Sequence, residues 1–109
     1  MSENRIRISA NTVAYADTES HKLVLEFAIP GAATDTIDVR VLDDRVTLRA
    51  PARDYEYVAA LALGWPVKAE KAEATYHHGL LRIEAPLKDP MENALKLPVR
   101  AGDWYRLGS

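Results

Sequence analysis

The sequence contains no cysteine. A chain without thiols forms no disulfide framework, offers no thiolate to a metal ion and has no cysteine nucleophile. It also lacks a long hydrophobic run, because no stretch approaches the roughly 20 consecutive apolar residues of a membrane span. The first residues contain no apolar core of a secretory signal. We therefore expect a cytoplasmic protein with no membrane partner.

An excess of charge of either sign is missing as well. The 109 residues carry 14 Lys and Arg against 16 Asp and Glu, for a net charge of −2. Binding to nucleic acid draws on a concentrated basic surface, whereas here acidic residues lie close to most of the basic ones. We expect no nucleic-acid partner. The length and the 48% of hydrophobic residues indicate one domain with one core.

What the chain does contain is a series of short stretches in which apolar residues alternate with polar or small ones. In the stretch 21–30, the alternate residues from Leu23 to Ile29 are large and apolar, which places them on one face of a strand. Pro30-Gly31 then ends this strand, because proline has no N–H to donate and glycine permits turn dihedrals.

The next apolar stretches predict a hairpin and a further strand. Residues 37–42 and 45–49 alternate in the same way on either side of Asp43-Asp44, which predicts a tight turn there. Both aspartates tolerate the left-handed region better than most residues. Residues 55–63 predict another strand, although their alanines also have fair helix propensity. Residues 51–54 leave only a short connection between the two.

The stretch 74–86 predicts two strands joined at Gly79, with Leu81 and Ile83 on the inward face. Six or seven short strands broken by Pro, Gly and Asp indicate an all-β fold, an antiparallel β-sandwich of immunoglobulin-like type. We expect three segments. Residues 1–20 form a short N-terminal arm, residues 21–87 form the sandwich, and residues 88–109 form a C-terminal extension.

Two polar clusters resemble sites of chemistry but favour simpler roles. His77 and His78 suggest a metal site, yet adjacent residues on a strand point to opposite faces and do not easily chelate one ion. Two exposed histidines before a glycine turn are the favoured interpretation. Asp43 and Asp44 suggest a carboxylate pair for acid–base work, but a hairpin tip offers no concave, dry site to separate their pKa values. Turn chemistry explains them better.

The aromatic residues raise the alternative of a stacking platform for single-stranded nucleic acid. Such a site also needs a basic groove, and the sequence predicts none. The candidates for that platform are Phe27, Tyr55, Tyr57, Trp65 and Tyr76. No nucleophile motif, phosphate-binding loop or dinucleotide fingerprint is present. We therefore expect no catalytic residue, no cofactor and no metal ligand, and a small enzyme is the least favoured class.

Four features in order resemble the α-crystallin domain of the small heat-shock proteins. They are the corner Ala28-Ile29-Pro30-Gly31, the hairpin that follows it, the stretch Ala74–Leu81 and the motif Leu97-Pro98-Val99. Ala74–Leu81 matches the family signature A-x-x-x-n-G-V-L in spacing, with His and Leu in place of Asn and Val. The fold markers of this resemblance are Pro30, Gly31, Ala74, Gly79 and Leu81.

The resemblance implies an ATP-independent chaperone that holds unfolding client proteins, as a homodimer or a larger homo-oligomer. It also implies that Leu97 and Val99 insert into a groove of a neighbouring subunit, with Pro98 keeping the segment extended. The expected groove lies between the strands at 37–42 and 72–76 and is lined by Val39, Val41 and Ala74. Beyond the motif, the apolar Trp104-Tyr105 indicates a packed contact.

The chain departs from the family pattern in two places. Bacterial and plant members carry a long loop with a strand that swaps between subunits, whereas only residues 51–54 stand at that position here. The arm before residue 21 is short and mostly polar. The shortened sandwich also resembles the CS-type co-chaperone domains, which implies a second hypothesis, an adaptor that binds one folded protein partner.

Overall fold

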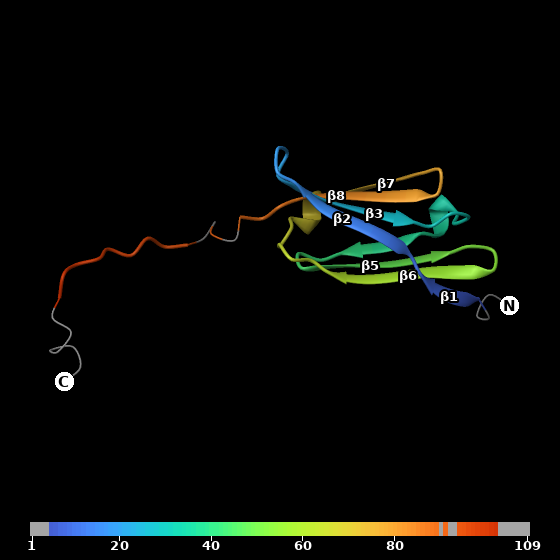
Figure 1. Cartoon of the computed structure of the whole chain (residues 1–109), viewed down its shortest axis with the longest axis horizontal. Coiled ribbons are helices and arrows are strands. Elements are labelled where there is room, and N and C mark those ends of the chain that lie inside the picture. The colour runs from blue at the N-terminus through green and yellow to red at the C-terminus, as the bar shows by residue number, and fades with distance from the viewer. Residues whose placement is uncertain (1–4, 90, 92–93, 103–109) are drawn as a thin grey trace, which may run out of the picture.

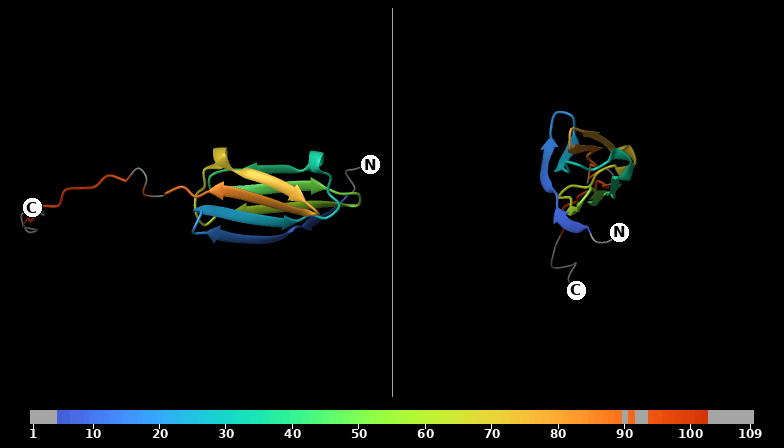
Figure 2. Two further views of the ribbon diagram at one scale, coloured as in Figure 1. Left: turned by 90° about the horizontal axis from the view of Figure 1, so that it is seen from above. Right: turned by 90° about the vertical axis from the view of Figure 1, so that its right-hand side faces the viewer.

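The computed structural model describes residues 5–89, 91 and 94–102. Two four-stranded sheets pack face to face as a β-sandwich (Figures 1 and 2), which confirms the predicted fold class. Sheet A has the strand order β1-β6-β5-β4, and sheet B has the order β2-β3-β8-β7. Two single turns of 3-10 helix, η2 (Thr34–Thr36) and η3 (Ala69–Lys71), join strands. Within the described ranges, no helix is long and apolar enough to cross a membrane.

The strands are β1 (Ile6–Ser9), β2 (Asn11–Asp17), β3 (Lys22–Ala28), β4 (Asp38–Val41), β5 (Arg45–Pro51), β6 (Tyr55–Ala62), β7 (Glu73–His77) and β8 (Leu80–Pro86). Their alternation builds the core between the sheets. Phe27, Ile29 and Ile83 are completely or almost completely buried on the side of sheet B, and Leu48 is buried on the facing side of sheet A. Burying a large aliphatic or aromatic side chain contributes about 1.5–3 kcal/mol, so these positions supply much of the driving force for folding.

Residues 6–17 belong to the sheets and not to a separate arm, which corrects the expectation for residues 1–20. β2 pairs with β3 from Asn11 to Asp17, and β1 pairs with the first half of β6. Ile8 and Ala10 pack against the core, which supplies the reason for this docking. The β1–β6 pairing is parallel, so sheet A is mixed where an antiparallel sheet was predicted. Ala10 alone links β1 to β2, and the chain crosses from sheet A to sheet B without reversing its direction (Figure 1).

The two connections of sheet A are as short as the sequence predicts. The Leu42 N–H donates to the Arg45 carbonyl across the Asp43-Asp44 turn, at 2.8 Å. Neither aspartate has a positive φ, so the turn does not use the left-handed conformation that we considered for them. Between β5 and β6 only residues 52–54 intervene. The long swapping loop of the family therefore has no counterpart between these strands.

Sheet B contains a tight turn that depends on a glycine. His78 has φ 48° and Gly79 has φ 80°, so both central residues of the β7–β8 turn are left-handed, as a two-residue hairpin prefers. A Cβ on Gly79 would lie 3.1 Å from the Pro30 Cα, closer than side chains normally approach. The Ile29 N–H donates to the Gly79 carbonyl at 2.8 Å. Glycine is thus required both for its φ and for the contact with Pro30.

Two tyrosines, one from each sheet, hold the loop that follows β3. The Tyr57 hydroxyl on β6 donates to the Pro30 carbonyl at 2.8 Å. The Tyr76 hydroxyl on β7 lies 3.0 Å from the carbonyl oxygens of Ile29 and Ala32. A hydrogen bond of this kind contributes a net of about 0.5–1.5 kcal/mol. These rings are anchors of the corner, a role that the sequence analysis did not assign to them.

We predict that Gly79→Val lowers the free energy of unfolding by about 1–3 kcal/mol, because a β-branched residue is strained at positive φ and meets Pro30 at this position. Chemical denaturation of the purified protein measures the change. Gly64→Ala is the matched control, since a Cβ there has no atom within 4 Å. Equal stability of Gly79→Val and the wild type would show that the turn is not constrained in this way.

Candidate functional site

The open edge of the sandwich is the side on which β4 and β7 lie. Each is the last strand of its sheet, and the two lie along the same side, opposite the side on which β1 continues into β2 (Figure 2). An edge strand presents backbone N–H and C=O groups without a partner strand, and such groups accept an added extended segment. The fold therefore offers two strand edges that border the space between the sheets.

The predicted lining residues face this space. Val39 is paired with the buried Leu48, and Val41 with the buried Val46, so both valines point inward from β4. On β7, Ala74 is paired with Ile83 and points to the same interior. The two valines are half-buried and Ala74 is exposed, because no further strand covers them. The register thus puts all three at the open edge, and their role as a groove stays a prediction.

The Leu97-Pro98-Val99 motif does not touch this edge in the structure. Residues 94–102 have no strand or helix and extend away from the sandwich (Figure 1). Leu97 is 74% exposed and Val99 is 93% exposed. The apolar residues Met91 and Leu95 nearby are also exposed. The sandwich holds the chain as far as Lys88, whose N–H donates to the Pro66 carbonyl at 2.8 Å. Trp104 and Tyr105, expected to form a contact, lie outside the described residues.

The histidine pair adopts a geometry that corrects our argument against chelation. The rings of His77 and His78 are stacked, with centroids 3.9 Å apart, so the two side chains do not point to opposite faces. The strand ends at His77, and the left-handed φ of His78 turns its ring back. Among the described residues no group of three metal-ligating side chains gathers.

The aromatic residues proposed for a stacking platform do not share one surface. Phe27 is completely buried, as expected of a core residue. Tyr55 begins β6, whereas Trp65 follows the other end of that strand, and both are largely exposed. Tyr57 and Tyr76 are turned toward the corner by their hydrogen bonds. The ring centroids of Tyr55 and Tyr57 are 6.5 Å apart, whereas Trp65 lies beyond the other end of β6.

An ion cluster that was not predicted from the sequence joins β1 to the neighbouring strands β6 and β5 of sheet A. The Glu56 carboxylate on β6 accepts from Arg49 on β5 at 2.9 Å and from Arg7 on β1 at 3.2 Å. The hydrogen bond from Arg49 is the main cause that lowers the pKa of Glu56, with further contributions from the charges of Arg49, Arg7 and Arg5. Only 11% of the Glu56 side chain is exposed. Sequence parity places Arg49 and Glu56 on one face, but the parallel docking of β1 was not foreseeable from it.

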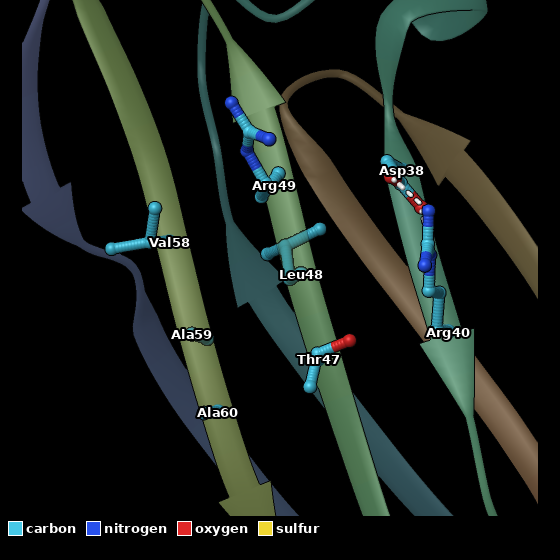
Figure 3. Close-up of a pocket in the computed structure, with 8 residues that line it drawn as sticks. All are labelled: Asp38, Arg40, Thr47, Leu48, Arg49, Val58, Ala59 and Ala60. Carbon is cyan, nitrogen blue, oxygen red and sulfur yellow. Dashed lines mark hydrogen bonds and ion pairs between the residues drawn. The ribbon is translucent and has the colours of Figure 1, made fainter.

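A shallow hollow lies on the outer face of sheet A, on the opposite face of the strands from the inward valines. Its volume is about 320 Å3. Figure 3 shows its lining on three neighbouring strands, with Asp38 and Arg40 on β4, Thr47, Leu48 and Arg49 on β5, and Val58, Ala59 and Ala60 on β6. Small side chains form its centre and two arginines stand beside it. No role was predicted for this surface from the sequence.

The strand order and the corner define an α-crystallin-type sandwich, and comparison with solved structures agrees. Heat shock protein 16.0 from Schizosaccharomyces pombe superposes with a TM-score of 0.69 at 12% identity, over 86% of this chain and 77% of that one. HSP18.5 from E. histolytica gives 0.68 at 9% identity, over 84% and 99%. The fold is that of the small heat-shock proteins, and the resemblance predicted from the sequence is confirmed.

Sequence comparison adds one curated relative. The 18 kDa antigen 2 of Mycobacterium avium is 32% identical over 85 residues, which cover 65% of this chain and 62% of the relative. The chain thus matches about three fifths of that protein's length. No family model matches the sequence.

We predict that Glu56→Gln changes how stability depends on pH. The pKa of Glu56 is lower in the folded chain than its ordinary value, so its stabilising contribution is complete above the unfolded pKa and is lost as pH falls through the folded pKa. The difference in unfolding free energy between wild type and Glu56→Gln should therefore be largest near neutral pH and shrink below roughly pH 4.

Urea denaturation at a series of pH values measures this difference. Glu70→Gln is the matched control, because Glu70 is exposed and makes no ion pair with any described residue. A wild type and a Glu56→Gln variant whose stabilities fall in parallel with acidification would contradict the role of the cluster.

Proposed function

We propose that the protein is a small heat-shock-type chaperone that binds unfolding polypeptides without ATP and assembles through its C-terminal extension. The observation that carries the proposal is that the chain has both an open apolar edge and an exposed apolar segment. Val39 and Val41 face the interior at the edge, while Leu97 and Val99 are exposed on the extension. Among the described residues, no strand covers the inward valines of β4, and Leu97 and Val99 pack against no part of the sandwich.

The chemistry of the segment fits docking along a strand edge. Leu97 and Val99 are two residues apart, so an extended backbone points both to the same side. Pro98 between them has a fixed φ and disfavours helix at the residue before it, which reduces the ordering cost of an extended segment. Burying the two side chains would contribute about 1.5–3 kcal/mol each. In this proposal, the extension of one subunit fills the edge of another and builds a homo-oligomer.

Client binding follows from the same edge. An unfolding protein exposes apolar, strand-like segments, and these compete for edges that accept an added strand. Edge docking uses backbone hydrogen bonds and apolar contacts, so it needs no nucleotide. We propose that this takes place in the cytoplasm, in keeping with a chain that has no cysteine.

The chaperone activity is tested by heating an aggregating model client with the purified protein at equal mass, without nucleotide. We expect light scattering from the client to be suppressed. An unrelated β-sandwich protein of similar size at equal mass is the control for nonspecific protection. If this chain protects no better than that control, the holdase proposal is wrong.

A second candidate function is an adaptor that binds one folded protein partner. Two observations favour it. Only residues 52–54 join β5 to β6, and β1 of the same chain already occupies the first half of the β6 edge. Both leave less opportunity for a swapped dimer. An affinity capture that yields one stoichiometric partner, instead of many denatured clients, would favour the adaptor over the chaperone.

We predict that Leu97→Ala combined with Val99→Ala lowers the mass of the assembly measured by light scattering, because the docked side chains are shortened. Met91→Ala combined with Leu95→Ala is the matched control, since these apolar residues are also exposed on the extension, at 68% and 86%, but lie outside the motif. An unchanged mass for the first pair, or an equal loss for both pairs, would contradict docking by the motif.

A further inference from the structure

The outer face of sheet A carries a surplus of positive charge in a chain whose net charge is −2. Val46 and Leu48 of β5 point inward, so Arg45 and Arg49 point outward, and the register places Arg40 of β4 and Arg7 of β1 on that same face. The acidic residues on this face of the strands are Asp38 and Glu56. Four arginines against two carboxylates leave two positive charges over.

The opposite face of the sandwich has the reverse balance. By the same parity, the strands of sheet B direct four carboxylates outward and only two basic groups. The carboxylates are those of Asp17, Glu26, Glu73 and Glu84, and the basic residues are Lys22 and Arg82. The surplus of arginine is thus a property of one face and not of the whole surface.

The hollow of Figure 3 lies within this arginine-bearing face. Thr47, Val58 and Ala60 are small, and they leave room between taller neighbours for the side chains of a bound segment. Arg40 is 78% exposed and Arg49 is 63% exposed along their side chains. Their guanidinium groups are therefore accessible at the hollow, with donors left over for a second carboxylate.

The carboxylates already present do not satisfy these arginines. Glu56 is shared between Arg49 and Arg7 and is nearly buried, so one charge balances two. Asp38 accepts two hydrogen bonds from Arg40, two positions away on the same exposed strand, one from Nε at 3.2 Å and one from Nη2 at 3.3 Å. Exposed ion pairs are typically worth about 0.2–1 kcal/mol, and the guanidinium of Arg40 has further N–H donors with which it can bind a second carboxylate.

We propose that this face binds an acidic, extended segment of a partner polypeptide, with small side chains seated over Thr47 and Ala60 and flanking carboxylates bound by Arg40 and Arg49. This surface is separate from the open edge at which the extension and clients are proposed to dock. The two proposals stand on different residues, so one can fail without the other.

The test uses the full chain and two peptides. The acidic probe is an acetylated, amidated peptide of alternating Glu and Ala, and the neutral probe replaces each Glu with Gln. Titration followed by two-dimensional amide NMR should show saturable shifts at Thr47, Val58 and Ala60 with the acidic peptide at low ionic strength. The shifts should diminish as salt is added, because screening weakens exposed charge pairs.

Two variants separate the hollow from general charge attraction. Arg40→Gln should weaken binding of the acidic peptide about three- to fivefold, as expected for an exposed charge pair, whereas Arg100→Gln on the extension removes the same charge and should leave the affinity unchanged. Ala60→Leu fills the hollow without changing the charge and should abolish the saturable shifts. The amide spectrum of each variant checks that the sandwich is folded.

Several outcomes would overturn the proposal. They are the absence of saturable shifts on this face, equal binding of the neutral peptide, and full affinity in Ala60→Leu. Shifts that depend on protein concentration and not on peptide would assign the face to another copy of the chain, which also contradicts an acidic partner segment. None of these results bears on heat protection or on the mass of the Leu97 and Val99 variant.

Discussion

The contact between Pro30 and Gly79 is the constraint on which the rest of the structure depends. Gly79 lies in a left-handed turn of sheet B, and its missing Cβ lets the Pro30 backbone approach. Two tyrosine hydroxyls, one from each sheet, then hold the carbonyls on either side of Pro30. Since this corner joins the end of β3 to both sheets, it fixes how the chain leaves sheet B to begin β4 in sheet A.

The position of β4 has a consequence for binding. Because the corner directs the chain into the last position of sheet A, β4 and β7 end on the same side of the sandwich. The opposite side carries the N-terminal strands, with β1 held to β6 by the Glu56 cluster. The N-terminal strands thus connect the two sheets on one side. On the other side, the half-buried inward valines of β4 are an apolar surface available to an extended segment.

The two proposed surfaces use different physical interactions. The open edge offers unpaired backbone groups and half-buried valines, so its binding energy is mainly apolar and insensitive to salt. The outer face of sheet A offers exposed arginines around a hollow of small residues, so its binding is electrostatic and screened by salt. The two proposals thus assign to one chain the binding of polypeptides of two kinds, those with apolar and those with acidic segments.

The sequence by itself determined the strands after residue 20, the core face, the short β5–β6 connection and the glycine turn, because alternation and turn chemistry are local properties of the chain. Val39, Val41 and Ala74 were expected as groove lining from the family resemblance, and their register places them on the inward face. Tertiary structure alone decided the parallel docking of β1, the stacking of His77 on His78, the tyrosine anchors and the arginine surplus on one face. Each of these depends on residues that are distant in sequence or on one φ angle, and neither is encoded in a local pattern.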